Sequence, residues 1–230
     1  MAAAPEDEVY ERKATDVTKT PYEPPVQGLL IKEVLTVFAD GKFRPNMPVT
    51  RAEFVNWCYN AVMVQSVPGA DPFAPTKSAF RKVLGSGEEF TDVPAEHWAV
   101  DVLATLQGAK LITDKAFRPD QPLTREEWAM FAALFAAPQS AREAIKKPLD
   151  AKQAQVVYRT RNFTDFDALK PATKPYVHFV LSDVARGRWL DDTFTLPEAP
   201  GPWHPGKAVT RGEAAAWIGG AFEAIGRDIF

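Results

Sequence analysis

The chain has 230 residues, of which 46% are hydrophobic, and a formal net charge of −3 at pH 7. Its length suffices for one sizeable core, and its charge balance excludes the basic surface on which nucleic-acid binding depends. The single cysteine, Cys58, excludes an intrachain disulfide and a cysteine-rich metal site. No stretch approaches the roughly 20 apolar residues of a transmembrane helix, so no membrane-spanning segment is expected.

Residues 1–14 are acidic and rich in alanine. They offer little apolar surface to bury, so we expect an extended arm that only a partner would order. Beyond the arm, two sequence landmarks each occur three times, which indicates tandem repeats that share one compact domain. The expected divisions are the arm (1–14), repeat 1 (15–64), a first connector (65–89), repeat 2 (90–137), a second connector (138–162) and repeat 3 (163–226).

A Thr-Asp pair starts each repeat, and we expect its carboxylate to cap the first helix of that repeat. The three aspartates are Asp16, Asp92 and Asp165. In the second repeat Trp98 starts an apolar pattern with helical spacing, which predicts an amphipathic first helix over 98–110. The first helices of the other two repeats are expected over about 25–37 and 175–185.

The second landmark is a stretch that contains proline and ends in Thr-Arg-x-Glu; its copies are Phe43–Glu53, Phe117–Glu127 and Trp203–Glu213. The threonine hydroxyl can accept the glutamate amide while the carboxylate accepts the threonine amide, so each copy forms a capping box that starts a second helix. Large apolar residues follow inside these helices and predict a common core. The tryptophans assigned to it are Trp57, Trp128 and Trp217.

These motifs together resemble the S-layer homology family, which typically has three tandem repeats. The motifs are Phe-Thr-Asp-Val, an aromatic residue before a helix, a Gly-bearing loop, Phe-x-Pro and Thr-Arg-x-Glu, and they cover about residues 15–226. The resemblance implies an all-α fold. Its expected form is a pseudo-threefold trimer of helix-loop-helix repeats around a central three-helix bundle, with long Pro-rich loops.

The resemblance also implies a function, which is to anchor a protein non-covalently to an anionic cell-wall polysaccharide. The arginine of each Thr-Arg-x-Glu motif would contact the acidic sugar, which here means Arg51, Arg125 and Arg211, with Asp40 and Gly41 shaping the first groove. An arginine in the first helical turn places its guanidinium beside free backbone amides, and both favour a carboxylate.

Two copies depart from the Thr-Arg-Ala-Glu pattern of the family. Glu126 adds a negative charge next to Arg125, and Gly212 lies in the first turn of the last helix. Both changes weaken the implied ligand site. The alternative interpretation makes each motif arginine a surface charge near a helix start, bonded to the preceding repeat.

No catalytic motif is present, and we predict no enzyme, no catalytic residue and no cofactor. The three histidines, His97, His178 and His204, share no metal-binding spacing, so no metal site is expected. Trp189 and Trp203 border the longest loop, and we expect them to contact a partner.

Two functions remain open. The first is a scaffold or linker inside a large protein assembly, such as a cyanobacterial photosynthetic antenna, contacted by the N-terminal arm and the long loops. The alternative is a cell-envelope module that binds an anionic cell-wall polysaccharide. The sequence starts without an export signal and contains no other domain to anchor, which favours the scaffold and a cytoplasmic location, including association with a membrane-bound complex. Removal of a signal would instead place the chain in the cell envelope.

Overall fold

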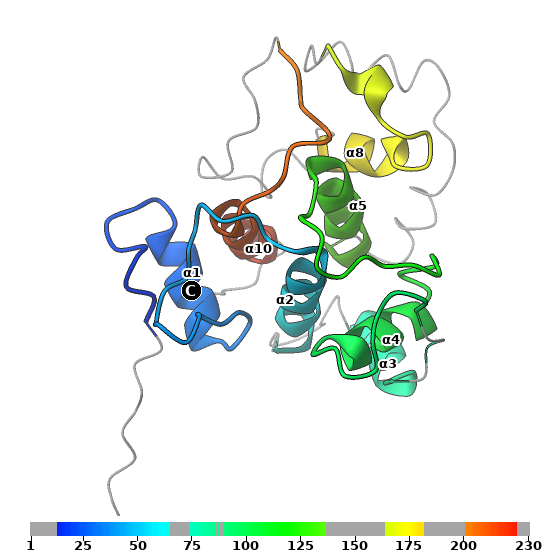
Figure 1. The fold of residues 1–230 in the computed structure, drawn as a ribbon, viewed down its shortest axis with the longest axis horizontal. Helices are drawn as coiled ribbons and strands as arrows, with labels where there is room; N and C mark the ends of the chain where they lie inside the picture. Colours follow the sequence, from blue (N-terminus) through cyan, green and yellow to red (C-terminus); the bar gives the residue numbers. More distant parts are fainter. Residues whose placement is uncertain are drawn as a thin grey trace, which may run out of the picture.

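The computed structural model describes residues 13–64, 74–85, 87, 90–136, 164–181 and 201–224 of the chain. Most of the expected arm, the second connector and Trp189 lie outside these residues. The helices are α1 (Glu23–Ile31), α2 (Arg51–Val64), α3 (Ala74–Lys82), α4 (Val100–Gly108), α5 (Arg125–Ala136), α8 (Lys174–Leu181) and α10 (Arg211–Ala224), with a 3-10 turn at Phe166–Ala168 (Figure 1). The all-α class is confirmed for the described residues, which contain isolated bridges but no strand.

The three capping boxes form as the sequence predicts. Glu53 Oε2 accepts the Thr50 amide at 2.9 Å, and Thr50 Oγ1 accepts the Glu53 amide at 3.2 Å. The same reciprocal pair joins Thr124 with Glu127 and Thr210 with Glu213. Helices α2, α5 and α10 therefore begin immediately after their capping threonines.

The first helices of the first and second repeats are shorter than expected. Helix α1 ends at Ile31 because Glu33 adopts a left-handed conformation with φ +59°, and the Val34 amide turns back to the Leu29 carbonyl at 2.9 Å. Lys110 ends α4 in the same way, with φ +57°. A left-handed residue stops a helix by redirecting the next amide.

The prediction that the three aspartates cap helices is wrong. Asp16 instead accepts the amides of Phe43 and Arg44, at 2.8 and 2.7 Å, from the start of the second landmark. Asp92 and Asp165 repeat this pair of bonds in the other two copies. The second residue of each amide pair has positive φ, and these residues are Arg44, Arg118 and His204. The carboxylate therefore holds a left-handed turn that carries no glycine.

The repeats contact one another in a cyclic order. The Val49 amide donates to the Val209 carbonyl at 3.0 Å, the Val209 amide to Leu123 at 2.8 Å, and the Leu123 amide to Val49 at 2.9 Å. These three bonds close a ring through one residue of each second landmark. The landmarks thus meet where the three second helices begin.

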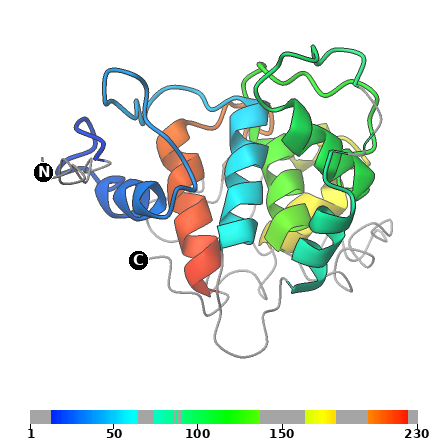
Figure 2. The same cartoon turned by 90° about the horizontal axis from the view of Figure 1, so that it is seen from below.

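The helices follow the same order. Helix α2 lies between α10 and α5 (Figure 2). Helix α1 packs against α10, α4 against α2, and α8 against α5. In each case the first helix of one repeat covers the second helix of the repeat before it in the cycle. The two helices that pack together therefore come from different sequence repeats.

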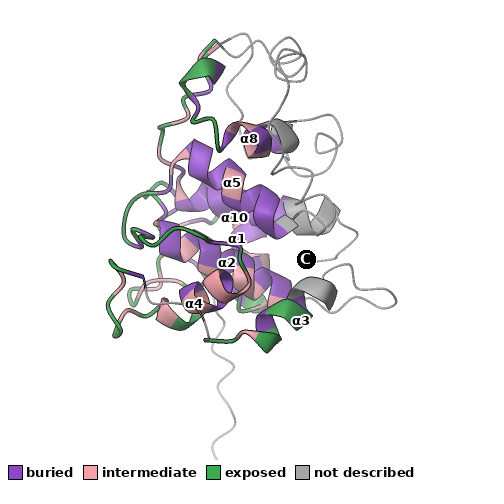
Figure 3. Cartoon of the chain, turned by 90° about the vertical axis from the view of Figure 1, so that its right-hand side faces the viewer, coloured by how far each residue is buried: buried purple, intermediate pink, exposed green. Residues whose placement is uncertain are grey.

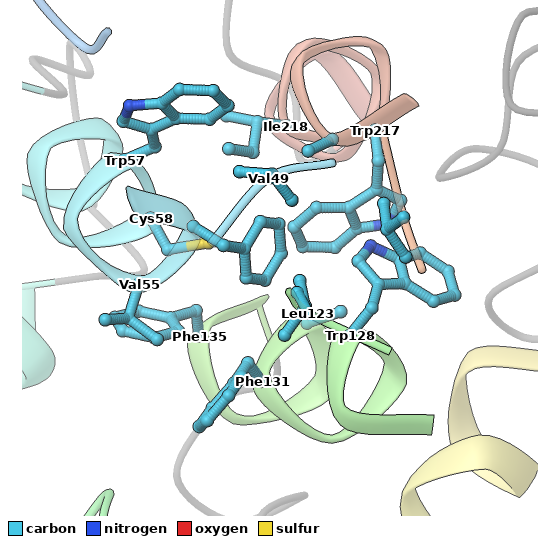
Figure 4. Close-up of a cluster of buried hydrophobic side chains, with 14 of the residues drawn as sticks. Val49, Val55, Trp57, Cys58, Leu123, Trp128, Phe131, Phe135, Trp217 and Ile218 are labelled. Atoms are coloured by element: carbon cyan, nitrogen blue, oxygen red, sulfur yellow. The ribbon is translucent and has the colours of Figure 1, made fainter. Parts of the chain in front are cut away.

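The core lies between α2, α5 and α10. The Trp217 ring centroid is 5.7 Å from that of Trp128 and 5.8 Å from that of Phe54 (Figure 4). Cys58 is fully buried nearby, and burial raises the pKa of its thiol well above the usual range. Figure 3 shows α5 and α10 largely buried, while α3 is partly exposed. None of the described helices is long and apolar enough to cross a membrane.

In the second and third copies, the third residue of the Thr-Arg-x-Glu motif contacts the segment just before the first helix of the next repeat in the cycle. Glu126 accepts the Lys170 amide at 2.7 Å and also the Thr173 hydroxyl, in the turn that precedes α8. The Glu126 carboxylate is thus bonded to the third repeat. Gly212 lies under the ring of Tyr22, which would be 2.9 Å from an added Cβ. These two residues therefore fit their own interfaces and are not interchangeable.

We expect Gly212→Ala to destabilise the fold by about 1 kcal/mol, because the Tyr22 contact outweighs the gain in helix propensity. The control is Gly206→Ala, since a Cβ there would meet no atom within 4 Å; it should leave stability unchanged or slightly higher. Urea denaturation of both variants measures the difference. Equal midpoints would show that Tyr22 yields to the methyl group at no cost.

Candidate binding groove

The three motif arginines extend from one repeat to the next. Arg51 Nε donates to the Phe117 carbonyl at 2.7 Å, and Arg211 Nε donates to the Phe43 carbonyl at 2.8 Å. Arg125 makes the equivalent bond through Nη1 to the carbonyl of Trp203, at 2.9 Å. Each arginine is at most 5% exposed, so none is a surface charge.

Each arginine also faces the capping glutamate of the repeat it reaches. Arg51 pairs with Glu127, and Arg211 pairs with Glu53. Arg125 lies farther from its acid, with 3.9 Å between Nη2 and Glu213 Oε1. The partner belongs to the following repeat and not to the preceding one, and for the third repeat the following repeat is the first. The glutamate therefore closes a capping box and neutralises a buried arginine at once.

Aromatic rings cover the guanidinium groups of Arg51 and Arg211. The Arg51 group lies 4.8 Å from the Phe117 ring centroid, and the Arg211 group lies 4.7 Å from those of Phe38 and Phe43. Burial lowers the pKa of both arginines, while the paired glutamates act in the opposite direction. The rings and the acids together hold each guanidinium in one place.

A cavity of about 310 Å³ opens above Arg211. Glu53, Asn56 and Trp57 from α2 line it, Phe38 closes it from the first-repeat loop, and residues of the second repeat complete it. Arg211 is the contribution of the third repeat, so all three repeats meet in this groove. We call it the Arg211 groove.

Trp98 forms the second-repeat wall of the Arg211 groove and is 58% exposed. The ring of His97 stacks on it at 5.5 Å. His97 is itself fixed, because its Nδ1 accepts the Ala99 amide at 3.1 Å and its Nε2 lies 3.4 Å from Asp120 Oδ1. The sequence placed Trp98 in an apolar helical stripe, which is wrong because α4 begins only at Val100.

The Asp-Gly turn has the expected conformation, with φ +72° at Gly41. The Asp40 carboxylate accepts the Lys42 amide at 3.1 Å and pairs with Arg44 at 3.3 Å, and both interactions lower the pKa of Asp40. Neither Asp40 nor Gly41 lines the Arg211 groove; Phe38, at the base of the turn, does.

Trp203 cannot serve as the predicted partner contact. It is 1% exposed and occupies the position that Phe43 and Phe117 hold in the other repeats. Its amide binds Asp165 at 2.7 Å, and its carbonyl accepts Arg125. A repeat-equivalent position therefore predicts burial better than proximity to a long loop does.

Comparison with known proteins supports the first two repeats. Residues 15–55 and 89–129 match the S-layer homology domain. The chain is also similar to Cell surface glycoprotein 1 of Acetivibrio thermocellus, with 33% identity over 113 residues, which is 48% of this chain and 4% of that protein. The chain therefore spans a small fraction of that relative. Both matched segments carry the capping box and the buried arginine described above, so two segments of this chain are similar to the S-layer homology domain.

Proposed function

We propose that this chain is a non-catalytic attachment module of the cell envelope that holds a cell-wall polysaccharide in the Arg211 groove. The observation that carries the proposal is the exposed indole of Trp98, fixed by His97 at the edge of a cavity built by three repeats. The family match and the surface location in the relative's name support an envelope role.

The Arg211 groove has the composition that a sugar requires. An exposed aromatic face binds the apolar side of a sugar ring, and its polar edge remains hydrated. Asn56 and Asp120 supply amide and carboxylate groups to the hydroxyls of that ring. The groove thus combines aromatic surface with polar side chains, a combination found in small-molecule sites.

The scaffold function receives no support from the family match or from the relative. It depended on the arm and the long loops, most of which lie outside the described residues. Ligand contact by Arg51, Arg125 and Arg211 stays a prediction. Because these arginines also join the repeats, replacing them would confuse loss of binding with loss of folding, and the test should use Trp98 instead.

We expect the purified chain to sediment with sacculi from the organism that encodes it. Trp98→Ala should lower the apparent affinity for the sacculi at least tenfold, which corresponds to about 1.4 kcal/mol of binding free energy. Leu84→Ala is the control, since Leu84 is 65% exposed and does not line the groove. Failure of the unmodified chain to sediment would refute the envelope role. Equal retention of both variants would show that the polysaccharide binds outside the Arg211 groove.

A further inference from the structure

We propose that His97 makes the wall of the Arg211 groove pH-sensitive: the neutral imidazole holds Trp98 in that wall, and protonation of the imidazole releases it. The inference rests on the proposed function, since it names a regulation of the same groove. The contacts of the His97 ring, together with the burial of the residues around it, determine this behaviour.

The contacts of His97 require its neutral form. A backbone amide can only donate, so the Ala99 amide, 3.1 Å from Nδ1, needs a lone pair on that nitrogen. The ring proton then lies on Nε2, which can donate to Asp120 Oδ1 at 3.4 Å. In a protonated imidazole both nitrogens carry hydrogen, and the Ala99 amide would face an N–H group in place of an acceptor.

The surroundings of the Ala99 amide leave little water to replace the lost bond. Ala99 is 1% exposed, and the His97 side chain is 9% exposed. A buried amide without an acceptor is unfavourable, so protonation drives the ring away from it. Ala99 immediately precedes α4. The turn that leads into this helix therefore changes with the charge of His97.

The charged groups around His97 do not cancel this effect. Asp120 favours an imidazolium, but its side chain is 80% exposed, and exposed ion pairs contribute little to stability. Glu96, which precedes His97 in the chain, is exposed as well. The other charged groups of the groove, Arg211 and Glu53, are paired with each other.

Trp98 follows the His97 ring. The two rings stack with 5.5 Å between their centroids and an angle of 29° between their planes. Protonation of the imidazole strengthens such a stack, because an aromatic face attracts a cation. When the imidazole leaves the Ala99 amide, the indole therefore moves with it, and the groove loses the aromatic wall that Trp98 forms.

Nuclear magnetic resonance of the chain without ligand tests the mechanism. We expect the Ala99 amide and the Trp98 indole N–H signals to shift between about pH 8 and about pH 5, together with the His97 ring protons. His97→Asn is the comparison, because an asparagine oxygen accepts the amide two residues on at any pH in this range. Neither signal should shift in that variant. A constant Ala99 signal in the unmodified chain, while the His97 ring titrates, would overturn the inference.

Asp120→Asn tests whether the carboxylate is the titrating group. The Ala99 shift should persist in this variant and move to lower pH, because a charge that favours the imidazolium is gone. Disappearance of the Ala99 shift would assign the change to Asp120 and would equally overturn the inference.

Retention on sacculi gives the functional readout. The apparent affinity of the unmodified chain should fall by at least about fivefold from about pH 7.5 to about pH 5, and that of His97→Asn should change by less than about twofold. Equal pH dependence of the two chains would assign the effect to carboxylates of the sacculi and contradict a role for His97. If neither chain binds at any pH, the proposed function fails, whereas the signals of the free chain still decide whether His97 controls the turn.

Discussion

Replacing Trp217 with alanine is expected to lower the free energy of unfolding by about 3–5 kcal/mol. Trp217 is 1% exposed and packs against Phe54 and Trp128, so it joins α10 to both α2 and α5. The vacated space lies where the three second helices meet. None of them can move in to fill it without shifting the ring of backbone bonds among Val49, Leu123 and Val209.

Trp98→Ala is the matched control, since it makes the same chemical change at a tryptophan that is 58% exposed. We expect it to alter stability by less than about 0.5 kcal/mol. Chemical denaturation followed by far-ultraviolet circular dichroism compares the two variants. Similar losses from both would contradict the central position of Trp217.

Replacing Arg51 with alanine is expected to cost about 3 kcal/mol of stability. The change leaves the Glu127 carboxylate, 11% exposed, without its buried partner and removes the bond to the Phe117 carbonyl. Arg118, 3.3 Å from Glu127, offsets part of this loss from the exposed side. Arg51→Lys should recover only part of it, because an ammonium group cannot serve the carbonyl and the carboxylate with the geometry of a guanidinium.

Arg44→Ala is the control for charge removal, because Arg44 lies at the surface with 45% of its side chain exposed. It should not shift the denaturation midpoint measurably. If Arg51→Ala also leaves the denaturation midpoint unchanged, the buried arginines do not stabilise the contact between repeats. Ligand contact would then be the remaining explanation for them.

The helix starts could be predicted from the sequence because a capping box involves residues only three apart, such as Thr50 and Glu53. The same holds for the Asp-Gly turn at Gly41. Local hydrogen bonding determines both features. The capping boxes and the apolar spacing predicted the second helices, while the all-α class was implied by the resemblance to the S-layer homology family.

The partners of the arginines could not be predicted in this way. Arg51 and Arg211 bind carbonyls 66 and 168 residues away in the chain. No spacing rule covers such separations, so the sequence could not show which groups the arginines bind. Asp16, bonded to amides 27 and 28 residues away, was assigned to a helix cap for the same reason.

The Arg211 groove could not be predicted from the sequence, because its wall residue Trp98 lies in a short turn before α4. Spacing alone placed Trp98 with Leu103 and Leu106 on one helical face, yet Trp98 precedes α4. The exposure of Trp98 depends on the turn held by His97 and the Ala99 amide. Single-sequence periodicity does not detect where a turn ends and a helix begins.

The cyclic order of contacts has a consequence for how the molecule can come apart. In an open repeat array the terminal units have one neighbour each and can fray independently. Here α1 covers α10, and Arg211 reaches the first repeat, so the two ends of the repeat series are themselves neighbours. Losing any one repeat breaks two interfaces, and unfolding should therefore have no preferred end at which to start.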